Sequence, residues 1–223
     1  MTIRAVLIDV DNTMLDRAAS VAKFVPIFRS EFAPRLGDVS DKAIAEVIGN
    51  IDESGALPRA TFLSPLISDL PWRSKPTLGE LIPFWTAVYP ECAMPMPGLR
   101  KTLDAIKAMG LPIGAITNGW GDVQYKKIGM LGVRSYMKSI TCAEQAGARK
   151  PDVRIFRKAL ASLGAKPEEA VHIGDNPDAD IAGATGAGMT AIWLSGTCEW
   201  PKGAAPAKHT INRLEDALGI IKM

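Results

Sequence analysis

The chain has 223 residues, of which 47% are apolar and 22% charged, and its formal net charge is only +2. This balance is ordinary for a globular protein and lacks the basic excess of a dedicated nucleic-acid binder. The sequence has no apolar run near the roughly 20 residues that span a bilayer. We therefore expect neither nucleic acid nor a membrane as a partner. The three widely spaced cysteines indicate reduced thiols in a cytoplasmic protein.

The first expected element is a strand over residues 4–8, where Ala5 to Ile8 form a continuous apolar run. Such a run is typical of a strand buried on both faces of a parallel sheet. The next five residues, Asp9–Thr13, read DVDNT. Two carboxylates at the end of a buried strand repel each other unless a cation or a proton lies between them. An alternative stays open at this point, in which these residues only form a hydrogen-bonded turn.

Residues 16–96 read as helices interrupted by prolines. The sequence predicts one amphipathic helix over residues 21–32, a second capped by Asp41, and a third opened by a capping box of Thr77 and Glu80. Residues 52–76 carry four prolines and read as a loop. We interpret residues 16–96 as an inserted helical cap domain, and residues 1–15 plus 97–223 as one catalytic α/β core.

The core repeats a strand-and-helix alternation. Strands are expected at 112–116, 139–142, 170–173 and 189–194, with an edge strand at 210–211. Helices are expected between them, one of them beginning at Pro151, and another is expected at the end of the chain. This alternation predicts a doubly wound parallel sheet with right-handed crossovers.

Polar residues follow several of these apolar runs: Thr117 and Asn118 follow one strand, Lys150 precedes a helix, and Asp175 and Asp180 follow another strand. The carboxyl ends of parallel strands meet at one edge of a sheet, where ligands bind. Acidic side chains there suit Mg²⁺, which prefers oxygen ligands. Backbone N–H groups of residues 118–119 and the Lys150 ammonium would hold an anion such as a phosphoryl group.

The motifs together resemble the haloacid dehalogenase superfamily, and specifically its phosphatases with a helical cap of the first type. Asp9–Thr13 matches the first motif, DxDx[TV], Thr117 the second, and Lys150 the third. Residues 174–180, GDNPDAD, match the fourth motif, GDxxxxD. They occur in the family order. The resemblance implies a Rossmann-like core with an inserted cap, and a Mg²⁺-dependent phosphatase acting on a small phosphorylated metabolite such as a nucleotide or sugar phosphate.

The resemblance also implies a role for each matched residue. Asp9 would attack phosphorus and form an aspartyl-phosphate, while Asp11 would act as general acid and base. The Asp9 and Asp175 side chains and the Asp11 carbonyl would hold Mg²⁺, and Asp180 would lie behind them against metal-bound water or Lys150. Thr117 and Lys150 would bind the phosphoryl oxygens, together with the backbone of Asn118. Thr13 is expected to order the turn.

Asp11 also separates branches of the superfamily. The dehalogenase branch lacks an acid two residues after its nucleophile, because a halide leaves without a proton and an alkoxide does not. A sugar phosphomutase and a non-enzymatic phospho-receiver stay open as alternatives. The stretch from Thr117 through Gln124 to Lys127 further resembles the branch with pyrimidine-nucleotide and acylneuraminate phosphatases. A monomer and a homodimer are both compatible with the sequence.

Overall fold

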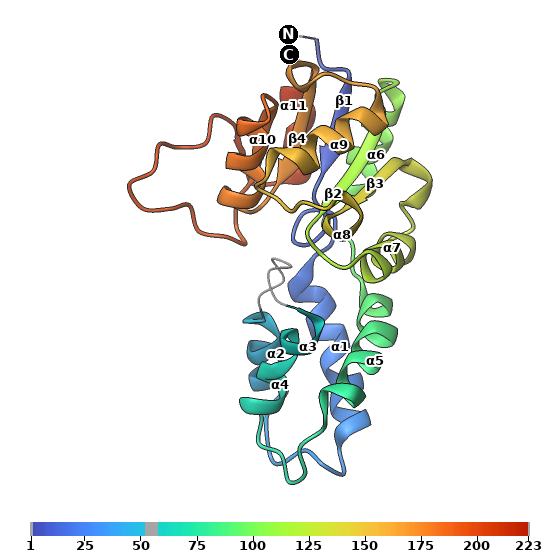
Figure 1. Cartoon of the computed structure of the whole chain (residues 1–223), viewed down its shortest axis with the longest axis vertical. Helices are drawn as coiled ribbons and strands as arrows, with labels where there is room; N and C mark the ends of the chain where they lie inside the picture. The colour runs from blue at the N-terminus through green and yellow to red at the C-terminus, as the bar shows by residue number, and fades with distance from the viewer. Residues whose placement is uncertain (1, 52–57, 223) are drawn as a thin grey trace. The chain divides into compact units, whose positions relative to one another are not determined.

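The computed structural model describes residues 2–51 and 58–222, with only the backbone described at residues 59–60. The chain forms two compact units. One unit consists of Met1–Asp16 and Pro95–Met223, and the other of Arg17–Met94 (Figure 1). The expected boundaries, 15/16 and 96/97, lie one and two residues away. That the helical unit acts as a cap stays a prediction.

The core unit is built on one six-stranded sheet in which all strands are parallel and follow the order β3-β2-β1-β4-β5-β6. The strands are β1 (Ala5–Ile8), β2 (Ile113–Thr117), β3 (Met137–Cys142), β4 (Ala170–Gly174), β5 (Thr190–Leu194) and β6 (Thr210–Ile211). The strand order reverses at β1, which pairs with β2 on one side and β4 on the other. The expected doubly wound parallel sheet is confirmed.

Strand β1 lies at the centre and is covered on both faces. All four of its residues are fully buried. Val6 lies opposite Ile113 and Val171 in the neighbouring strands. Alternate side chains of a strand point to opposite faces, so Ala5 and Leu7 share one face. Their face belongs to a core cluster that also contains buried residues of α9 and α10.

Helices surround this sheet, and α9 lies across one face of it in Figure 1. The helical segments of the core are α6 (Leu99–Ala108), α7 (Gly121–Met130), η2 (Arg134–Tyr136), α8 (Ala143–Ala146), α9 (Val153–Leu163), η3 (Pro167–Glu169), η4 (Pro177–Ala182), α10 (Gly183–Gly186), η5 (Leu214–Asp216) and α11 (Ala217–Ile221). Gly110 and Gly164 follow α6 and α9 with positive φ, as residues that end helices commonly do.

The helical unit packs around aromatic side chains. Its segments are α1 (Arg17–Phe32), α2 (Asp41–Gly49), α3 (Arg59–Phe62), α4 (Ser64–Ser68), α5 (Leu78–Val88) and η1 (Tyr89–Cys92). Phe24 is fully buried, and its ring lies 5.2 Å from that of Trp85 and 5.3 Å from that of Tyr89. The i, i+3, i+4 spacing of apolar residues on α1 produces this buried face.

The structure corrects three local expectations. Residues 52–76 are not all loop, because α3 and α4 lie within them; residues 52–57 fall outside the described chain. Ser40, not Asp41, caps α2, since its Oγ accepts the Ala43 N–H at 3.1 Å. Helix α9 begins at Val153 rather than Pro151. Its cap is Asp152, whose carboxylate accepts the Arg154 N–H and so satisfies a first-turn donor.

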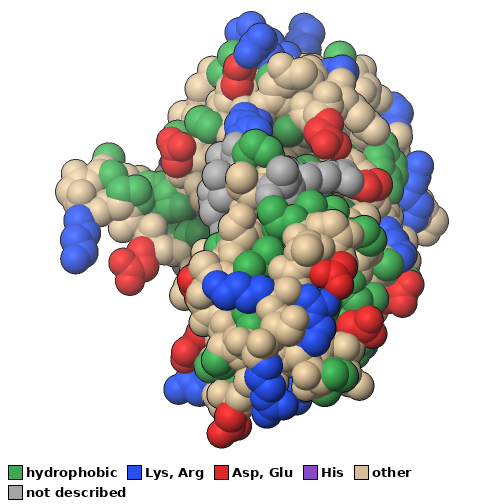
Figure 2. Space-filling view, turned by 60° about the horizontal axis from the view of Figure 1, so that its bottom comes forward, with side chains coloured by type: hydrophobic (Ala, Val, Ile, Leu, Met, Phe, Trp, Pro, Cys, Tyr) green, Lys and Arg blue, Asp and Glu red, His purple; other side chains and the backbone are tan. Residues whose placement is uncertain are grey.

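Charges of both signs are distributed over the surface. On the face drawn in Figure 2, Lys and Arg side chains are interspersed with Asp and Glu side chains, as the small net charge predicts. Within the described residues, every helix is too short or too polar to cross a bilayer.

Candidate active site

The DVDNT segment turns sharply as soon as β1 ends. The Asp9 N–H still donates to the Ile173 carbonyl of β4 at 2.9 Å, so Asp9 continues the sheet. The Val10 carbonyl then accepts the N–H groups of Met14 at 2.9 Å and Leu15 at 2.8 Å. Asn12 has a φ of 59°, a left-handed conformation that asparagine tolerates better than most residues. The turn therefore presents Asp9 and Asp11 at the carboxyl edge of the sheet.

Thr13 does not order this turn through its side chain. Its hydroxyl oxygen is buried without a hydrogen-bond partner among the described residues. The backbone N–H of Thr13 makes a 3.4 Å contact with the Val10 carbonyl. The backbone bonds to Val10 thus define the turn.

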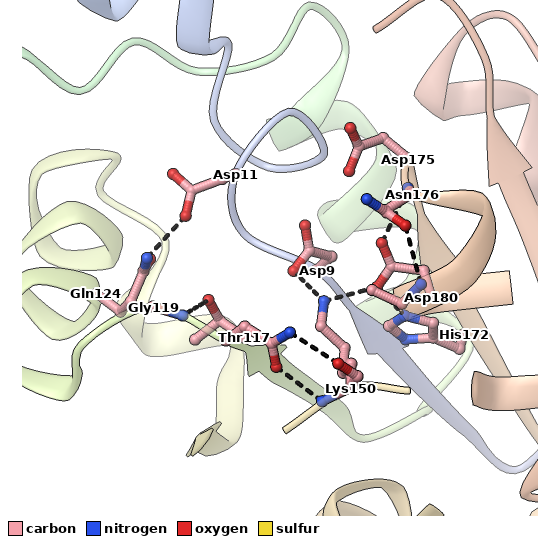
Figure 3. A network of polar contacts seen from close by, with 12 residues as sticks. Asp9, Asp11, Thr117, Gly119, Gln124, Lys150, His172, Asp175, Asn176 and Asp180 are labelled. Carbon is pink, nitrogen blue, oxygen red and sulfur yellow. Dashed lines mark hydrogen bonds and ion pairs between the residues drawn. The ribbon is translucent and has the colours of Figure 1, made fainter. Parts of the chain in front are cut away.

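Asp9 and Asp180 share the ammonium group of Lys150 (Figure 3). The Lys150 Nζ lies 2.5 Å from Asp9 Oδ1 and 2.6 Å from Asp180 Oδ1. All three side chains are buried. Asp180 also contacts His172 Nε2 at 2.9 Å and accepts the Asn176 N–H at 3.0 Å. Residues 141 positions apart in the chain are thereby joined by one ion-pair network.

The glycine of the fourth motif makes room for this network. A Cβ atom placed on Gly174 would lie 2.3 Å from Cγ of Asp180, far closer than atoms can approach. A larger residue there would displace the Asp180 carboxylate from Lys150. Gly174 therefore ends strand β4 and also leaves the space that the Asp180 side chain needs.

Asp175 lies beside the same group and is oriented by a different loop. Its Oδ2 accepts the Thr197 hydroxyl at 2.8 Å and contacts the Cys198 thiol at 3.2 Å. The Trp193 indole N–H donates to the Asp175 backbone carbonyl at 2.8 Å. Two side chains of the segment after β5 thus hold one carboxylate oxygen of Asp175.

The three acids form a pocket of oxygen atoms that fits a divalent cation. One carboxylate oxygen from each of Asp9, Asp175 and Asp180 lies within 4.8 Å of the others. All three residues are buried, and Lys150 supplies one positive charge between two of them. Three carboxylates against one ammonium leave an excess of two negative charges when all are ionised. A hard dication with oxygen ligands would balance this excess.

The pKa values reflect this crowding. Burial raises the pKa of Asp9 well above its usual range, and the charges of Asp180 and Asp175 raise it further against the opposing effect of Lys150. Burial, followed by the Asp180 charge, also raises the pKa of Asp175. Burial raises the pKa of Asp180 as well, but Lys150 and His172 outweigh burial, so the pKa of Asp180 is lowered. Asp180 is therefore the acid that most firmly keeps its charge.

Lys150, the cation of this network, also keeps its charge. Burial alone would lower the pKa of Lys150, but the carboxylates of Asp180 and Asp9 outweigh burial and raise that pKa. Burial lowers the pKa of His172, which favours the neutral imidazole. His172 is a fully buried residue of β4, and its ring contacts Asp180. Lys150 thus remains an ammonium at neutral pH and His172 does not add a second charge.

Asn118 holds Lys150 in place through the backbone. Its side-chain Oδ1 accepts the Lys150 N–H at 2.8 Å, and its Nδ2 donates to the Lys150 carbonyl at 3.0 Å. Thr117, at the end of β2, is buried, and its Oγ1 accepts the Gly119 N–H at 3.1 Å. The expected anion-binding turn therefore also fixes the lysine that precedes α9.

Asp11 points away from the three acids toward helix α7 (Figure 3). The Lys127 Nζ lies 2.6 Å from Asp11 Oδ1, and the Gln124 Nε2 donates to Asp11 Oδ2 at 2.7 Å. Lys127 and Gln124 are both buried. The two acids of the DVDNT segment thus have separate partners: Asp9 has Lys150, and Asp11 has Lys127.

The fold brings most of the expected residues together. Asp9, Lys150, Asp180 and Asp175 form one group, and Asn118 adjoins it through the backbone of Lys150. Thr117 directly precedes Asn118 at the end of β2. Thr197 and Cys198, which orient Asp175, carry no sequence motif, and neither does the pairing of Lys127 and Gln124 with Asp11. One feature of the sequence indicated the contact with Asp11: residues 124 and 127 have i, i+3 spacing on a helix that follows a motif strand.

Comparison with known proteins identifies the family. The sequence profile described as haloacid dehalogenase-like hydrolase matches residues 3–188. Glyceraldehyde 3-phosphate phosphatase from Methanocaldococcus jannaschii is 29% identical over 229 residues, which cover 99% of this chain and 97% of that protein. A protein of the same name from Methanopyrus kandleri is 40% identical over 98 residues. That alignment covers 44% of this chain and 42%, less than half, of the Methanopyrus protein.

A solved structure shares the fold over its whole length. HAD-hydrolase YfnB from Bacillus subtilis, in a crystal form bound to magnesium, superposes with a TM-score of 0.80 at 21% identity and covers 100% of both chains. The profile match spans most of the chain and includes all four motifs, from Asp9 to Asp180. This protein therefore belongs to the haloacid dehalogenase-like hydrolase family.

Proposed function

We propose that this protein is a Mg²⁺-dependent phosphomonoester hydrolase of a small phosphorylated metabolite, which reacts through an aspartyl-phosphate on Asp9. The observation that carries the proposal is the arrangement of the two acids of the DVDNT segment. Asp9 lies with Asp175, Asp180 and Lys150, while Asp11 lies apart with its own donors. A nucleophile beside a cation site and a separate acid–base group are the two functions that phosphoester cleavage through a covalent intermediate needs.

In the first half-reaction, a carboxylate oxygen of Asp9 forms a bond to phosphorus as the bond from phosphorus to the leaving oxygen breaks. Asp11 gives its proton to that oxygen, and the alcohol departs. In the second half, Asp11 takes a proton from water, the water oxygen bonds to phosphorus, and Asp9 is released with inorganic phosphate. Lys150, Thr117 and the backbone N–H groups after β2 would bind the phosphoryl oxygens and spread their charge.

Asp9, Asp175 and the Asp11 carbonyl would hold Mg²⁺, with Asp180 fixing Lys150 and adjoining the metal. When bound, the ion would neutralise the phosphoryl oxygens as a Lewis acid. The carboxylates of Asp9 and Asp175 support their part of this assignment, because with Asp180 they form a group of oxygens whose negative charge exceeds that of Lys150 by two. The Asp11 carbonyl is carried over from the family resemblance.

The relatives support a small substrate. Both relatives described above are named glyceraldehyde 3-phosphate phosphatase. We extend to this chain only the class of small phosphorylated metabolites, including sugar and nucleotide phosphates. The presence of Asp11 favours an ester over a carbon–halogen bond, since an alkoxide needs a proton to leave. We further propose that residues 16–96, inserted directly after the nucleophile segment, carry the substrate selectivity.

The test is phosphate release from p-nitrophenyl phosphate with and without Mg²⁺, comparing the wild type with Asp9→Asn. We expect the wild type to turn over only with Mg²⁺, and Asp9→Asn to lose at least about 10³-fold in kcat because it lacks the nucleophile. Asp178→Asn is the matched control, since Asp178 is an exposed acid of the same motif. Full activity of a folded Asp9→Asn protein would refute the proposal.

Further measurements with labelled substrates separate the alternatives. Radiolabelled phosphate that moves between sugar hydroxyls without appearing as free phosphate would indicate a phosphomutase. A long-lived aspartyl-phosphate without turnover would indicate a phospho-receiver. A phosphate-release screen over nucleotides, sugar phosphates and phosphoglycolate would then define the substrate.

A further inference from the structure

Helix α7 provides a two-point support for the Asp11 carboxylate. Each oxygen of Asp11 has its own donor: Lys127 Nζ at 2.6 Å from Oδ1, and Gln124 Nε2 at 2.7 Å from Oδ2. Residues three apart on a helix lie on one face, so the two donors reach the carboxylate from the same side. Figure 3 shows the Asp11 side chain directed at Gln124 and away from Asp9.

Lys127 is an unusual residue for its position. It is 2% exposed on a helix, although lysines are almost never fully buried unless they are paired. A buried ammonium needs an opposite charge and hydrogen-bond partners to offset its lost hydration. Asp11, 116 residues earlier in the sequence, supplies the carboxylate. Burial of this lysine is thus explained by its contact with Asp11.

The absence of a side chain at Gly119 leaves room for the Gln124 amide. A Cβ atom on Gly119 would lie 2.0 Å from Nε2 of Gln124 and 2.8 Å from its Cδ. The turn after β2 therefore leaves space that the Gln124 amide fills. The segment after Thr117 shapes the place of Gln124 as well as the proposed phosphate site.

We propose that Lys127 and Gln124 are positioning residues for Asp11, and that they hold its carboxylate in one orientation for proton transfer to the leaving oxygen and from water. This inference rests on the proposed function. The Gln124 amide fixes the plane of the carboxylate by binding the oxygen that Lys127 does not bind. The Lys127 ammonium compensates the negative charge left on Asp11 once its proton has moved to the leaving oxygen. Asp11 exchanges only a proton, and it regains that proton from water in the second half-reaction.

The test uses two esters of similar size whose leaving groups differ in basicity. Phenolate is the more basic leaving group and depends more on a proton than p-nitrophenolate does. In single turnovers with Mg²⁺, we expect Lys127→Met to slow phosphoryl transfer from phenyl phosphate by about 10²-fold, and from p-nitrophenyl phosphate by less than about tenfold. Protein-bound phosphate should also accumulate once the first half-reaction with p-nitrophenyl phosphate has occurred, because activation of the water needs Asp11 as well.

Three further variants keep the test decisive. Lys127→Arg keeps the positive charge and should restore most of the lost rate with phenyl phosphate. Gln124→Leu should change the ratio of the two rates in the same direction by about tenfold or less. Lys126→Met removes the neighbouring lysine of α7, which is not buried, and should leave both rates unchanged. If Lys127→Met fails to fold, Lys127→Arg and Gln124→Leu carry the comparison.

The outcomes separate this inference from the proposed function. Absence of phosphate release by the wild type from either ester would overturn the proposed function. Release by the wild type but not by Asp9→Asn, combined with equal slowing of both esters by Lys127→Met and Gln124→Leu, would overturn only the role of α7. A change in the ratio of rates, with accumulated phosphoenzyme and rescue by arginine, would support it.

Discussion

The two units of this chain use their interiors differently. Among the described residues, the buried charged side chains all belong to the core unit: Asp9, Lys127, Lys150, Asp175 and Asp180. The interior of the helical unit is apolar and aromatic, and Ser20 is its one buried polar residue in the same part of the chain. Burying charge opposes folding unless partners compensate, whereas burying rings favours it. Buried charges thus oppose folding at the candidate active site of the core unit, whereas the interior of the helical unit carries no such cost among the described residues.

The substitution Lys150→Met should have the largest effect on the buried charges of the core unit. Removing the ammonium leaves Asp9 and Asp180 buried without their shared cation. We expect a loss of about 3–5 kcal/mol in the free energy of unfolding without Mg²⁺, since one partner of a buried ion pair is gone. Activity should fall by at least about 10²-fold, because Lys150 would also hold the phosphoryl oxygens.

Thermal unfolding with and without Mg²⁺ measures the stability effect. A dication would replace part of the missing positive charge, so Mg²⁺ should raise the Tm of Lys150→Met by more than it raises that of the wild type. Lys158→Met, at an exposed position on α9, is the matched control and should unfold like the wild type. An unchanged Tm of Lys150→Met without Mg²⁺ would contradict the electrostatic account of the site.

The corresponding change in the helical unit is Phe24→Ala. Phe24 is fully buried, and its ring also lies 5.9 Å from that of Phe28 and 5.8 Å from that of Phe84. The cavity and the lost apolar contacts should cost about 3–5 kcal/mol. This cost should be the same with and without Mg²⁺, because no charge is involved. Urea unfolding under both conditions measures it, with Ile27→Ala on the exposed face of α1 as the control.

The smallest expected effect concerns Glu80 at the start of α5. Its pKa is lowered to about 2 by hydrogen bonds from the Thr77 backbone, from Arg35 and from the Thr77 hydroxyl. In the unfolded chain this carboxyl has a pKa near 4.5. Its contribution to stability is therefore complete above about pH 4.5 and disappears as the pH falls toward 2. Glu80→Gln should lower the Tm slightly at pH 7.

The difference in Tm between Glu80→Gln and the wild type should narrow as the pH is lowered from 5 to 3. Acids of the core titrate equally in both proteins, so the difference isolates Glu80. Glu46→Gln, an exposed glutamate of α2 with a 3.8 Å ion pair to Lys42, serves as the reference. A difference that stays constant with pH would show that the capping contact does not set the pKa of Glu80.

Local sequence was sufficient for most elements. The run at Ala5–Ile8 predicted β1, and the apolar spacing in residues 21–32 predicted α1. Periodicity works here because burial of one helical face or of a whole strand selects residue types directly. Helix boundaries were harder to predict: serine and aspartate are both common cap residues, and Ser40 rather than Asp41 caps α2. Short helices such as α4 carry too few residues for a periodic signal.

Some groupings of residues in the candidate site could likewise be predicted from the sequence, and others could not. Motif residues at strand ends, such as Asp9 and Asp175, could be grouped from the sequence because parallel strands end at one edge. The partners of Asp11 could not be, since their contacts depend on how far α7 lies from β1. The roles assigned to the site residues stay predictions until the variants are measured.

Sequence alone determined the parallel sheet, the helical insertion and the set of acids at the strand ends, because each follows from patterns within a few residues. The family resemblance already offered Lys150 as one of two partners for Asp180, whereas the pairing of Lys150 with Asp9 and of Lys127 with Asp11 became known from the folded chain. The reason is physical. A buried ion pair requires two groups within about 4 Å, and that distance is set by the packing of whole elements rather than by their order in the chain.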